Sequence, residues 1–194
     1  ETQNKVEIRE KNGITYAMLN YTYGTNGMPV PSGKNYLVNV WPTDLEINDP
    51  KRDTNYQNYK KQVKQDIDAI RGKVDVLMVA MHWGVEYVYK PNKEQTSLAK
   101  MMVRYGADLI IGTHPHVLQP IEWIETSNGN KALCYYSLGN YTSGQKATPR
   151  VLGGMAKIEL KRINDSVFIN NAGVIPLITH YEWVNGTSLH QTYK

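Results

Sequence analysis

Apolar and polar residues alternate in two short runs near the start of the chain, Val6 to Glu10 and Ile14 to Asn20. The segment Lys11-Asn12-Gly13 separates them, and an Asn-Gly step readily adopts the positive backbone angles of a tight hairpin turn. The pattern therefore predicts an opening β-hairpin. The next stretch, Tyr21 to Asn55, is rich in Gly, Pro, Asn and Asp, which predicts loop structure with one possible short strand at Tyr36 to Val40.

A helical period follows this loop, because apolar residues recur three or four positions apart. The positions are Tyr59, Val63, Ile67 and Ile70. Gly72 comes next, where a helix C-cap is expected.

Two nearly all-apolar runs, Val74 to Met81 and Leu109 to Gly112, have the length and composition of buried parallel strands. Between them lies a second helical pattern, which Asn92 can cap together with Gln95 and which ends at Gly106. Its apolar stripe is Leu98, Met101, Met102 and Tyr105. The segment therefore predicts a βαβ unit with a right-handed crossover.

The second half of the chain predicts antiparallel structure. Gln119 to Glu125 is expected to pair with Lys131 to Ser137, and Gly154 to Arg162 with Val167 to Ile175, because turn-forming residues separate the members of each pair. The tail from Pro176 onward is expected to be irregular cover.

Length and composition favour a single domain of 194 residues, with 41% hydrophobic content. The net charge of +4 is spread along the chain, so we expect no nucleic-acid partner. The apolar runs are far shorter than the ~20 residues of a membrane-spanning helix. Because the chain begins at Glu1 without a start methionine, signal or anchor, we expect it to be part of a longer protein. Cys134, in an apolar stretch, is expected to be a buried hydrophobe rather than a nucleophile.

Histidines follow both predicted parallel strands. His82 leaves the first strand, and His114 and His116 leave the second. The carboxyl ends of parallel strands meet at one edge of a sheet, where open α/β sheets build their sites. Pro115 favours extended geometry at the residue before it, so imidazoles two positions apart can point to one side. This arrangement predicts a polar site that suits zinc, manganese or iron.

Five motifs in order give the chain a resemblance to a known family. They are Met81-His82-Trp83-Gly84-Val85-Glu86-Tyr87, Gln95 with Leu98-Ala99, Gly106-Ala107-Asp108, Gly112-Thr113-His114-Pro115-His116-Val117 and Ser137-Leu138-Gly139-Asn140-Tyr141. Over about Gly13 to Asn140 the chain resembles the CapA-type capsule biosynthesis family, associated with poly-gamma-glutamate. That family resembles calcineurin-like metallophosphoesterases, in which a lone histidine after one strand and a Gly-x-His-x-His element after the next bind a metal pair. The resemblance assigns His82, His114 and His116 as metal ligands.

The resemblance also assigns three catalytic candidates, Glu86, Glu122 and Asn140. Glu86 would orient a ligating imidazole or act as general acid or base, and the alternative is a salt bridge at a strand end. Glu122 and Asn140 would line the same cleft, and the alternatives are a solvated strand face and a turn residue. Trp83 and Tyr87 are expected to wall the cleft or to pack in the core.

The chain departs from the family pattern at its start. The family's Gly-Asp, Asn-Leu-Glu and Asn-Asn-His elements, which contribute its acidic and remaining ligands, have no counterpart here. We therefore expect residues 1–194 to be the C-terminal part of one metallophosphatase-like domain, with the N-terminal half absent. The expected fold class is a layered α/β sandwich with a parallel βαβ unit and additional antiparallel hairpins. A divalent metal is expected in the intact protein, with weak or no binding by this part alone.

The resemblance implies a function in making or exporting an anionic surface polymer, poly-gamma-glutamate in the named family. The expected partners are that polymer or its synthesis complex and the missing half of the domain. The intact protein is expected outside the cytoplasmic membrane, held by an anchor that lies beyond this chain. Two alternatives stay open, a metal-dependent phosphoesterase and a non-catalytic subunit that binds or assembles polymer. His180 and His190, in the tail, are expected to be surface residues.

Overall fold

A computed structural model describes residues 6–41 and 52–193. Its central sheet has six strands in the order β1-β2-β3-β4-β6-β5. These strands are β1 (Ile8–Lys11), β2 (Ile14–Thr22), β3 (Val76–His82), β4 (Leu109–Thr113), β5 (Ile121–Glu125) and β6 (Lys131–Tyr135). A second sheet contains β7 (Leu152–Ile163), β8 (Ser166–Val184) and β9 (Thr187–Tyr193). The helices are α1 (Arg52–Arg71), α2 (Lys93–Tyr105), the short α3 (Thr148–Val151) and a 3-10 turn at Asn35–Leu37.

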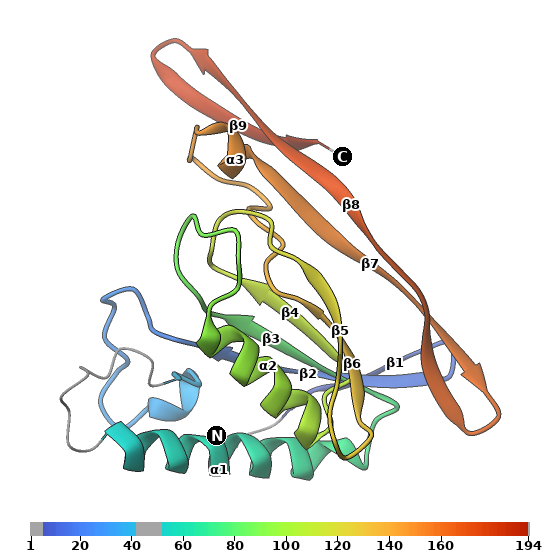
Figure 1. Ribbon diagram of the computed structural model, residues 1–194. Helices are drawn as coiled ribbons and strands as arrows, with labels where there is room; N and C mark the ends of the chain where they lie inside the picture. The colour runs from blue at the N-terminus through green and yellow to red at the C-terminus, as the bar shows by residue number, and fades with distance from the viewer. Residues whose placement is uncertain (1–5, 42–51, 194) are drawn as a thin grey trace.

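The elements form three layers (Figure 1). Helices α1 and α2 cover one face of the central sheet, where Leu77, Val79 and Met81 of β3 are buried among apolar helix residues. The opposite face contacts the second sheet, because Leu133 and Tyr135 of β6 are buried against apolar residues of β7 and β8. The expected layered α/β sandwich with a parallel unit and antiparallel hairpins is confirmed.

The predicted βαβ unit is present. Strands β3 and β4 are parallel neighbours, with His82 opposite Thr113, and α2 crosses between them. Asn92 and Gln95 form a reciprocal capping box at the start of α2, and Gly106 ends the helix in a left-handed conformation. Strand β2 adds to the other side of β3 in parallel, which extends the parallel sheet beyond the predicted pair.

The three predicted hairpins are also present, as β1-β2, β5-β6 and β7-β8. The prediction of an irregular tail was wrong. Strand β8 continues through Pro176 to Val184 and turns at Asn185-Gly186, which has positive φ at both residues, into β9. Pro176 is tolerated there because its pairing with Gly154 precedes the β8 positions that pair with β9, so that side of the strand needs no N–H donor.

The expected short strand at Tyr36 to Val40 was also wrong. Residues Asn35–Leu37 form a 3-10 turn, and Val40 makes only an isolated parallel bridge to Thr22. Residues 42–51 of the predicted loop lie outside the described residues. Among the helices that the structure describes, none combines the length and the apolar character needed to cross a membrane.

Candidate functional site

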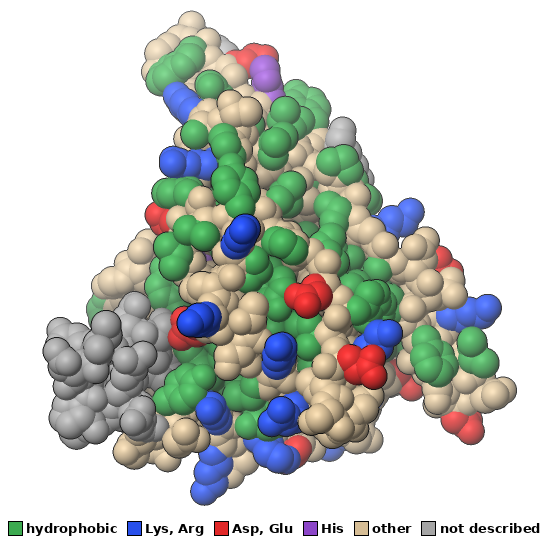
Figure 2. Space-filling view, in the orientation of Figure 1, with side chains coloured by type: hydrophobic (Ala, Val, Ile, Leu, Met, Phe, Trp, Pro, Cys, Tyr) green, Lys and Arg blue, Asp and Glu red, His purple; other side chains and the backbone are tan. Residues whose placement is uncertain are grey.

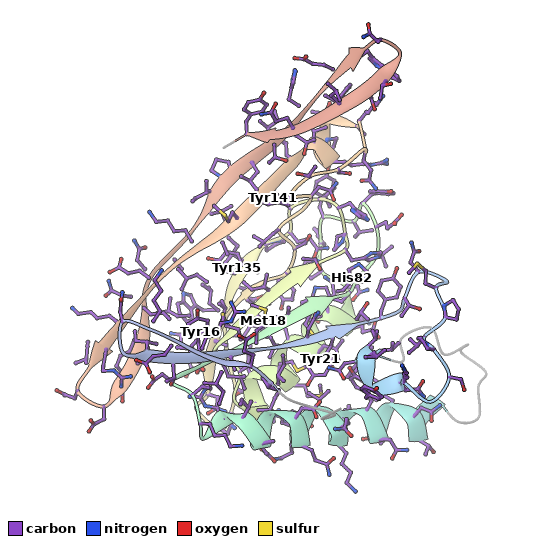
Figure 3. The ribbon with its side chains drawn as sticks, turned by 180° about the vertical axis from the view of Figure 1, so that it is seen from behind. Tyr16, Met18, Tyr21, His82, Tyr135 and Tyr141 are labelled. Carbon is purple, nitrogen blue, oxygen red and sulfur yellow. The ribbon has the colours of Figure 1, made fainter. Side chains whose placement is uncertain are left out.

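Three histidines converge at the carboxyl edge of the parallel strands. His82 is the last residue of β3, and His114 and His116 follow the end of β4. The ring centroids of His82 and His114 are 4.6 Å apart, and those of His114 and His116 are 5.7 Å apart. In Figure 3, His82 lies at the opposite end of the sheet from Tyr16, which marks the start of β2. The predicted meeting of these side chains at one edge is what the structure has.

The backbone at this edge is unusual. His114, His116 and Tyr87 have φ angles of 96°, 58° and 65°, a region that L-residues with a side chain rarely adopt. The expectation that Pro115 holds His114 in extended geometry was therefore wrong, although the two imidazoles still reach the same side. Such conformations cost about 1–3 kcal/mol each and gather at functional sites. A hydrogen bond from the Tyr87 N–H to the Pro115 carbonyl, 2.7 Å long, joins the two segments.

The orientation of His82 is set by Thr22. The Thr22 hydroxyl donates its proton to the Gly24 carbonyl over 2.8 Å, so it must act as acceptor toward the Nδ1 atom of His82, 3.0 Å away. The proton of neutral His82 therefore lies on Nδ1, and Nε2 carries the free lone pair. Tyr23 stacks on the same ring, with centroids 5.1 Å apart and an angle of 10° between planes.

Asn140 orients His116 in the same way. The Asn140 Nδ2 group donates to the Arg150 carbonyl at 2.9 Å, so its Oδ1 atom faces the Nδ1 atom of His116, 2.7 Å away. An amide oxygen only accepts, which places the His116 proton on Nδ1 and leaves Nε2 free. Asn140 is 9% exposed, and its hydrogen bonds to His116 and to the Arg150 carbonyl fix the orientation of its amide. It is therefore a positioning residue for the imidazole rather than the plain turn residue of the alternative prediction.

Glu86 lies on the loop after β3 and faces His116. Its Oε1 atom is 3.7 Å from the Nε2 atom of His116, and ligand atoms of Glu86, His114 and His116 all lie within 4.8 Å of one another. Gln119 anchors this loop, because its side-chain amide donates to the Val88 carbonyl and accepts a hydrogen bond from the buried Gln95 side chain. The carboxylate therefore lies beside the imidazoles of His114 and His116, and its side chain is 49% exposed.

Glu122 lies away from the histidines. It pairs with Cys134 across the antiparallel β5-β6 ladder, so its side chain shares the face of Cys134 and Tyr136. That is the helix-covered face, whereas His82 alternates with buried Met81 and so projects from the other face. Burial raises the pKa of the Tyr136 phenol, and Cys134 and the hydrogen-bonded Glu122 raise that pKa further. Glu122 therefore does not line the same cleft as Asn140.

The remaining sequence candidates divide in the same way. Trp83 is 1% exposed and donates its indole N–H to the Tyr136 carbonyl, so it packs in the core. Tyr87 lies at the rim beside His116, with ring centroids 6.0 Å apart. Cys134 is buried, as predicted, and burial raises the pKa of its thiol. His180 is exposed and pairs with Glu182, as expected of a surface residue, whereas the side chain of His190 lies outside the described residues.

The electrostatics of the cluster favour the neutral form of His82 and of His114. Burial lowers the pKa of His82, and the neighbouring charges of His114 and His116 lower it further. Burial also lowers the pKa of His114, and His116 adds to this effect while Glu86 opposes it. Neutral imidazole is the metal-binding form, and the free Nε2 atoms of His82 and His116 are the ligand atoms it offers. Glu86, His114 and His116 have ligand atoms within 4.8 Å of one another, and this donor set of two imidazoles and one carboxylate fits a divalent ion such as zinc, manganese or iron.

Sequence reasoning missed the residues that hold the cluster from outside. Thr22 is the last residue of β2, and Tyr23 follows it. A third parallel strand ending at the same edge of the sheet was the signal that could have pointed to these two residues. Arg150 was missed as well. Its guanidinium lies 3.6 Å from the ring centroid of Tyr87, a contact between segments far apart in the chain.

Comparison with known proteins identifies the family. The family described as "Bacterial capsule synthesis protein PGA_cap" matches residues 1–145. The chain belongs to this family. It is 33% identical over 162 residues to "PGA biosynthesis protein CapA" of Bacillus subtilis (strain 168), covering 84% of this chain and 37% of the relative. It is 42% identical over 85 residues to "Capsule biosynthesis protein CapA" of Bacillus anthracis, covering 44% of this chain and 20% of the relative.

The chain thus spans well under half the length of these curated relatives of the PGA_cap family. Among solved structures, a hypothetical protein from Thermus thermophilus aligns with a TM-score of 0.46 and 13% identity. That alignment covers 88% of this chain and 61% of the other. The Plasmodium protein GAP50 aligns with a TM-score of 0.41 and 10% identity, covering 97% of this chain and 48% of the other.

Proposed function

We propose that this chain serves capsule biosynthesis at the cell envelope, in the making or export of poly-gamma-glutamate. The observation that carries the proposal is the convergence of His82, His114, His116 and Glu86 at the carboxyl edge of the parallel strands in a PGA_cap family chain. The printed names of two relatives, which concern PGA and capsule biosynthesis, support the polymer assignment. Localisation outside the cytoplasmic membrane and an anchor elsewhere in the intact protein are part of the proposal.

The same cluster is proposed to hold one divalent ion. Its ligands would be imidazole Nε2 atoms and the Glu86 carboxylate, and the bound ion would supply a positive charge that attracts and polarises an anionic substrate group. A second ion close by would need further carboxylates, and the described part of the chain places only Glu86 beside the histidines. Binding by this chain is therefore proposed to be limited to one weak site.

A metal-dependent phosphoesterase is the second candidate. The observation in its favour is access, because the side chains of His116 and Glu86 are 29% and 49% exposed at an open edge. Glu86 lies where it can move a proton to or from a group bound beside His116. A non-catalytic subunit that binds or assembles polymer would keep the same cluster without turnover.

A metal titration followed by a phosphodiesterase assay tests these candidates. Calorimetry with Mn²⁺ and Zn²⁺ is expected to give one weak site per chain, and the variant Glu86→Gln is expected to weaken it further. His180→Ala removes an exposed histidine of β8 that pairs with Glu182, and it is the matched control for His116→Ala in the metal titration. Two tight sites per chain would contradict the proposed ligand set. Hydrolysis of a phosphodiester that depends on His116 would favour the second candidate.

A further inference from the structure

Two cations on one short segment lie over aromatic rings, and one of these rings, Tyr87, lies beside the histidine cluster. The guanidinium of Arg150 lies 3.6 Å from the ring centroid of Tyr87, and the ammonium of Lys146 lies 4.0 Å from that of Trp183 and 5.2 Å from that of Tyr181. Lys146 lies four residues before Arg150 in the sequence. With the residues that the structure describes, neither cation forms an ion pair or a side-chain hydrogen bond.

Arg150 is tied directly to the histidine site. Tyr87, which it covers, lies with its ring centroid 6.0 Å from that of His116. The Arg150 carbonyl accepts from Asn140, the residue that also orients His116. The aromatic ring holds the flat face of the guanidinium, which leaves its edge of N–H donors available to a ligand. A half-buried cation with free donors beside a metal-binding cluster is a binding group for an anion.

Lys146 borders a second feature, a pocket of about 600 Å³ between α3 and the β8-β9 hairpin. Its lining includes Thr148, His180 and Tyr181, and the ring of Tyr181 is one of the two rings over which the Lys146 ammonium lies. Figure 2 shows Lys and Arg side chains lying among hydrophobic ones over this upper part of the molecule. Gln145, the residue before Lys146, donates its side-chain amide to the Tyr87 hydroxyl at 3.2 Å, so the segment that carries Lys146 is bonded to the ring that Arg150 covers.

We infer that Arg150 and Lys146 bind two carboxylates of an anionic polymer that extends from the histidine cluster toward the β8-β9 hairpin. The inference rests on the proposed function and names the substrate-binding residues for it. The planar guanidinium matches a carboxylate with two parallel hydrogen bonds. Two separate cations suit a ligand with repeated charges better than one small anion. The rings of Tyr87, Tyr181 and Trp183 beside these cations suit the methylene groups that separate carboxylates in poly-gamma-glutamate.

The test is binding of fluorescein-labelled poly-gamma-glutamate to the purified protein, followed by fluorescence anisotropy. Arg150→Gln is expected to weaken binding by ~10-fold or more, since hydrogen bonds to a charged group are lost. Lys146→Met is expected to weaken it by ~2- to 5-fold, as for an exposed ion pair. Two matched controls remove the same charges elsewhere. They are Arg104→Gln in α2 and Lys131→Met on the β5-β6 hairpin, where the Lys131 ammonium lies over the ring of Trp123.

The inference is supported if Arg150→Gln and Lys146→Met weaken binding while both controls bind as the wild type does, with unchanged thermal melting. Equal weakening by Arg150→Gln and Arg104→Gln would overturn it, because net charge alone would then explain binding. Lower melting of Lys146→Met with unchanged affinity would reduce Lys146 to a structural contact and would overturn its half of the inference. If the wild-type protein binds the polymer and all four variants bind it equally well, the inference about Arg150 and Lys146 fails but the proposed function does not. Absent wild-type binding defeats the polymer proposal itself, and binding of polyphosphate in its place would point to the phosphoester candidate.

Discussion

Replacing Asn140 tests whether a side chain outside the cluster determines which nitrogen of His116 is free. Asn140→Leu removes the acceptor of the 2.7 Å bond to His116 Nδ1 and the donor of the 2.9 Å bond to the Arg150 carbonyl. Each polar group left without a partner costs about 1–3 kcal/mol, so the loss at these two groups is expected to lower the free energy of unfolding by about 2–6 kcal/mol. Loss of such an orienting partner lowers metal affinity by about 10- to 100-fold.

Asn140→Asp separates the two effects. A carboxylate still accepts from His116 Nδ1–H, so metal affinity is expected to stay within ~3-fold of wild type, a change of under ~1 kcal/mol. The Arg150 carbonyl nevertheless loses its donor, so the protein is expected to be less stable than wild type. Asn130→Leu is the control, because Asn130 bonds to the Val103 and Arg104 carbonyls at the end of α2, far from the site.

Calorimetry with Mn²⁺ or Zn²⁺, chemical denaturation and ¹⁵N NMR of the imidazoles provide the measurements. In wild-type protein the NMR spectrum is expected to show His116 protonated on Nδ1. If Asn140→Leu keeps both the Nδ1 proton and wild-type metal affinity in a folded protein, Asn140 does not orient His116 and the reasoning fails.

Two further predictions concern the framework that carries the site. Gly112→Ala places a Cβ 2.0 Å from the Tyr136 carbonyl oxygen, so the free energy of unfolding measured in urea is expected to fall by about 2–5 kcal/mol. Gly72→Ala meets nothing within 4 Å and is expected to be neutral or stabilising, and equal effects of the two would contradict the packing argument. Hydrogen bonds from Thr15 and Arg162 lower the pKa of Asp75 from 3.8 to about 2. The unfolded chain therefore binds more protons between these values, so stability is lost as pH falls through that window. Asp75→Asn is expected to lower stability at neutral pH and to flatten this acid loss in denaturation curves recorded at several pH values, whereas an unchanged acid slope would sink the assignment.

Much of the fold could be predicted because local signals and tertiary packing agree. Asn92, Gln95 and Gly106 mark both ends of α2 by hydrogen-bonding rules that act within the helix itself. Asn185-Gly186 carries the same kind of local signal for the β8-β9 hairpin, and the prediction of an irregular tail from Pro176 onward did not use it. The proline is compatible with the strand only because β9 pairs farther along, which is a tertiary fact.

The candidate site was predictable to the extent that topology determines it. The parallel βαβ unit requires His82 and His114 to leave the same edge of the sheet, and they do. Glu122 could not be placed in this way, because strand alternation decides its face and the pairing with Cys134 is visible only in the sheet register. Arg150 could not be found either, since its contact with Tyr87 joins segments that no sequence period relates.

Polymer production in cells that carry His114→Ala, His116→Ala or both tests the central claim most directly, together with thermal melting of the purified variants. Both histidines lie on the loop after β4 outside the buried apolar core, so melting is expected to change little. Lys131→Met, on the β5-β6 hairpin, is the control for a substitution outside both the histidine cluster and the pocket that Lys146 borders. The account predicts that the cluster variants lose surface poly-gamma-glutamate while the control produces it at the wild-type level. Wild-type polymer yield from a well-folded double variant would contradict the claim that the histidine cluster serves capsule biosynthesis.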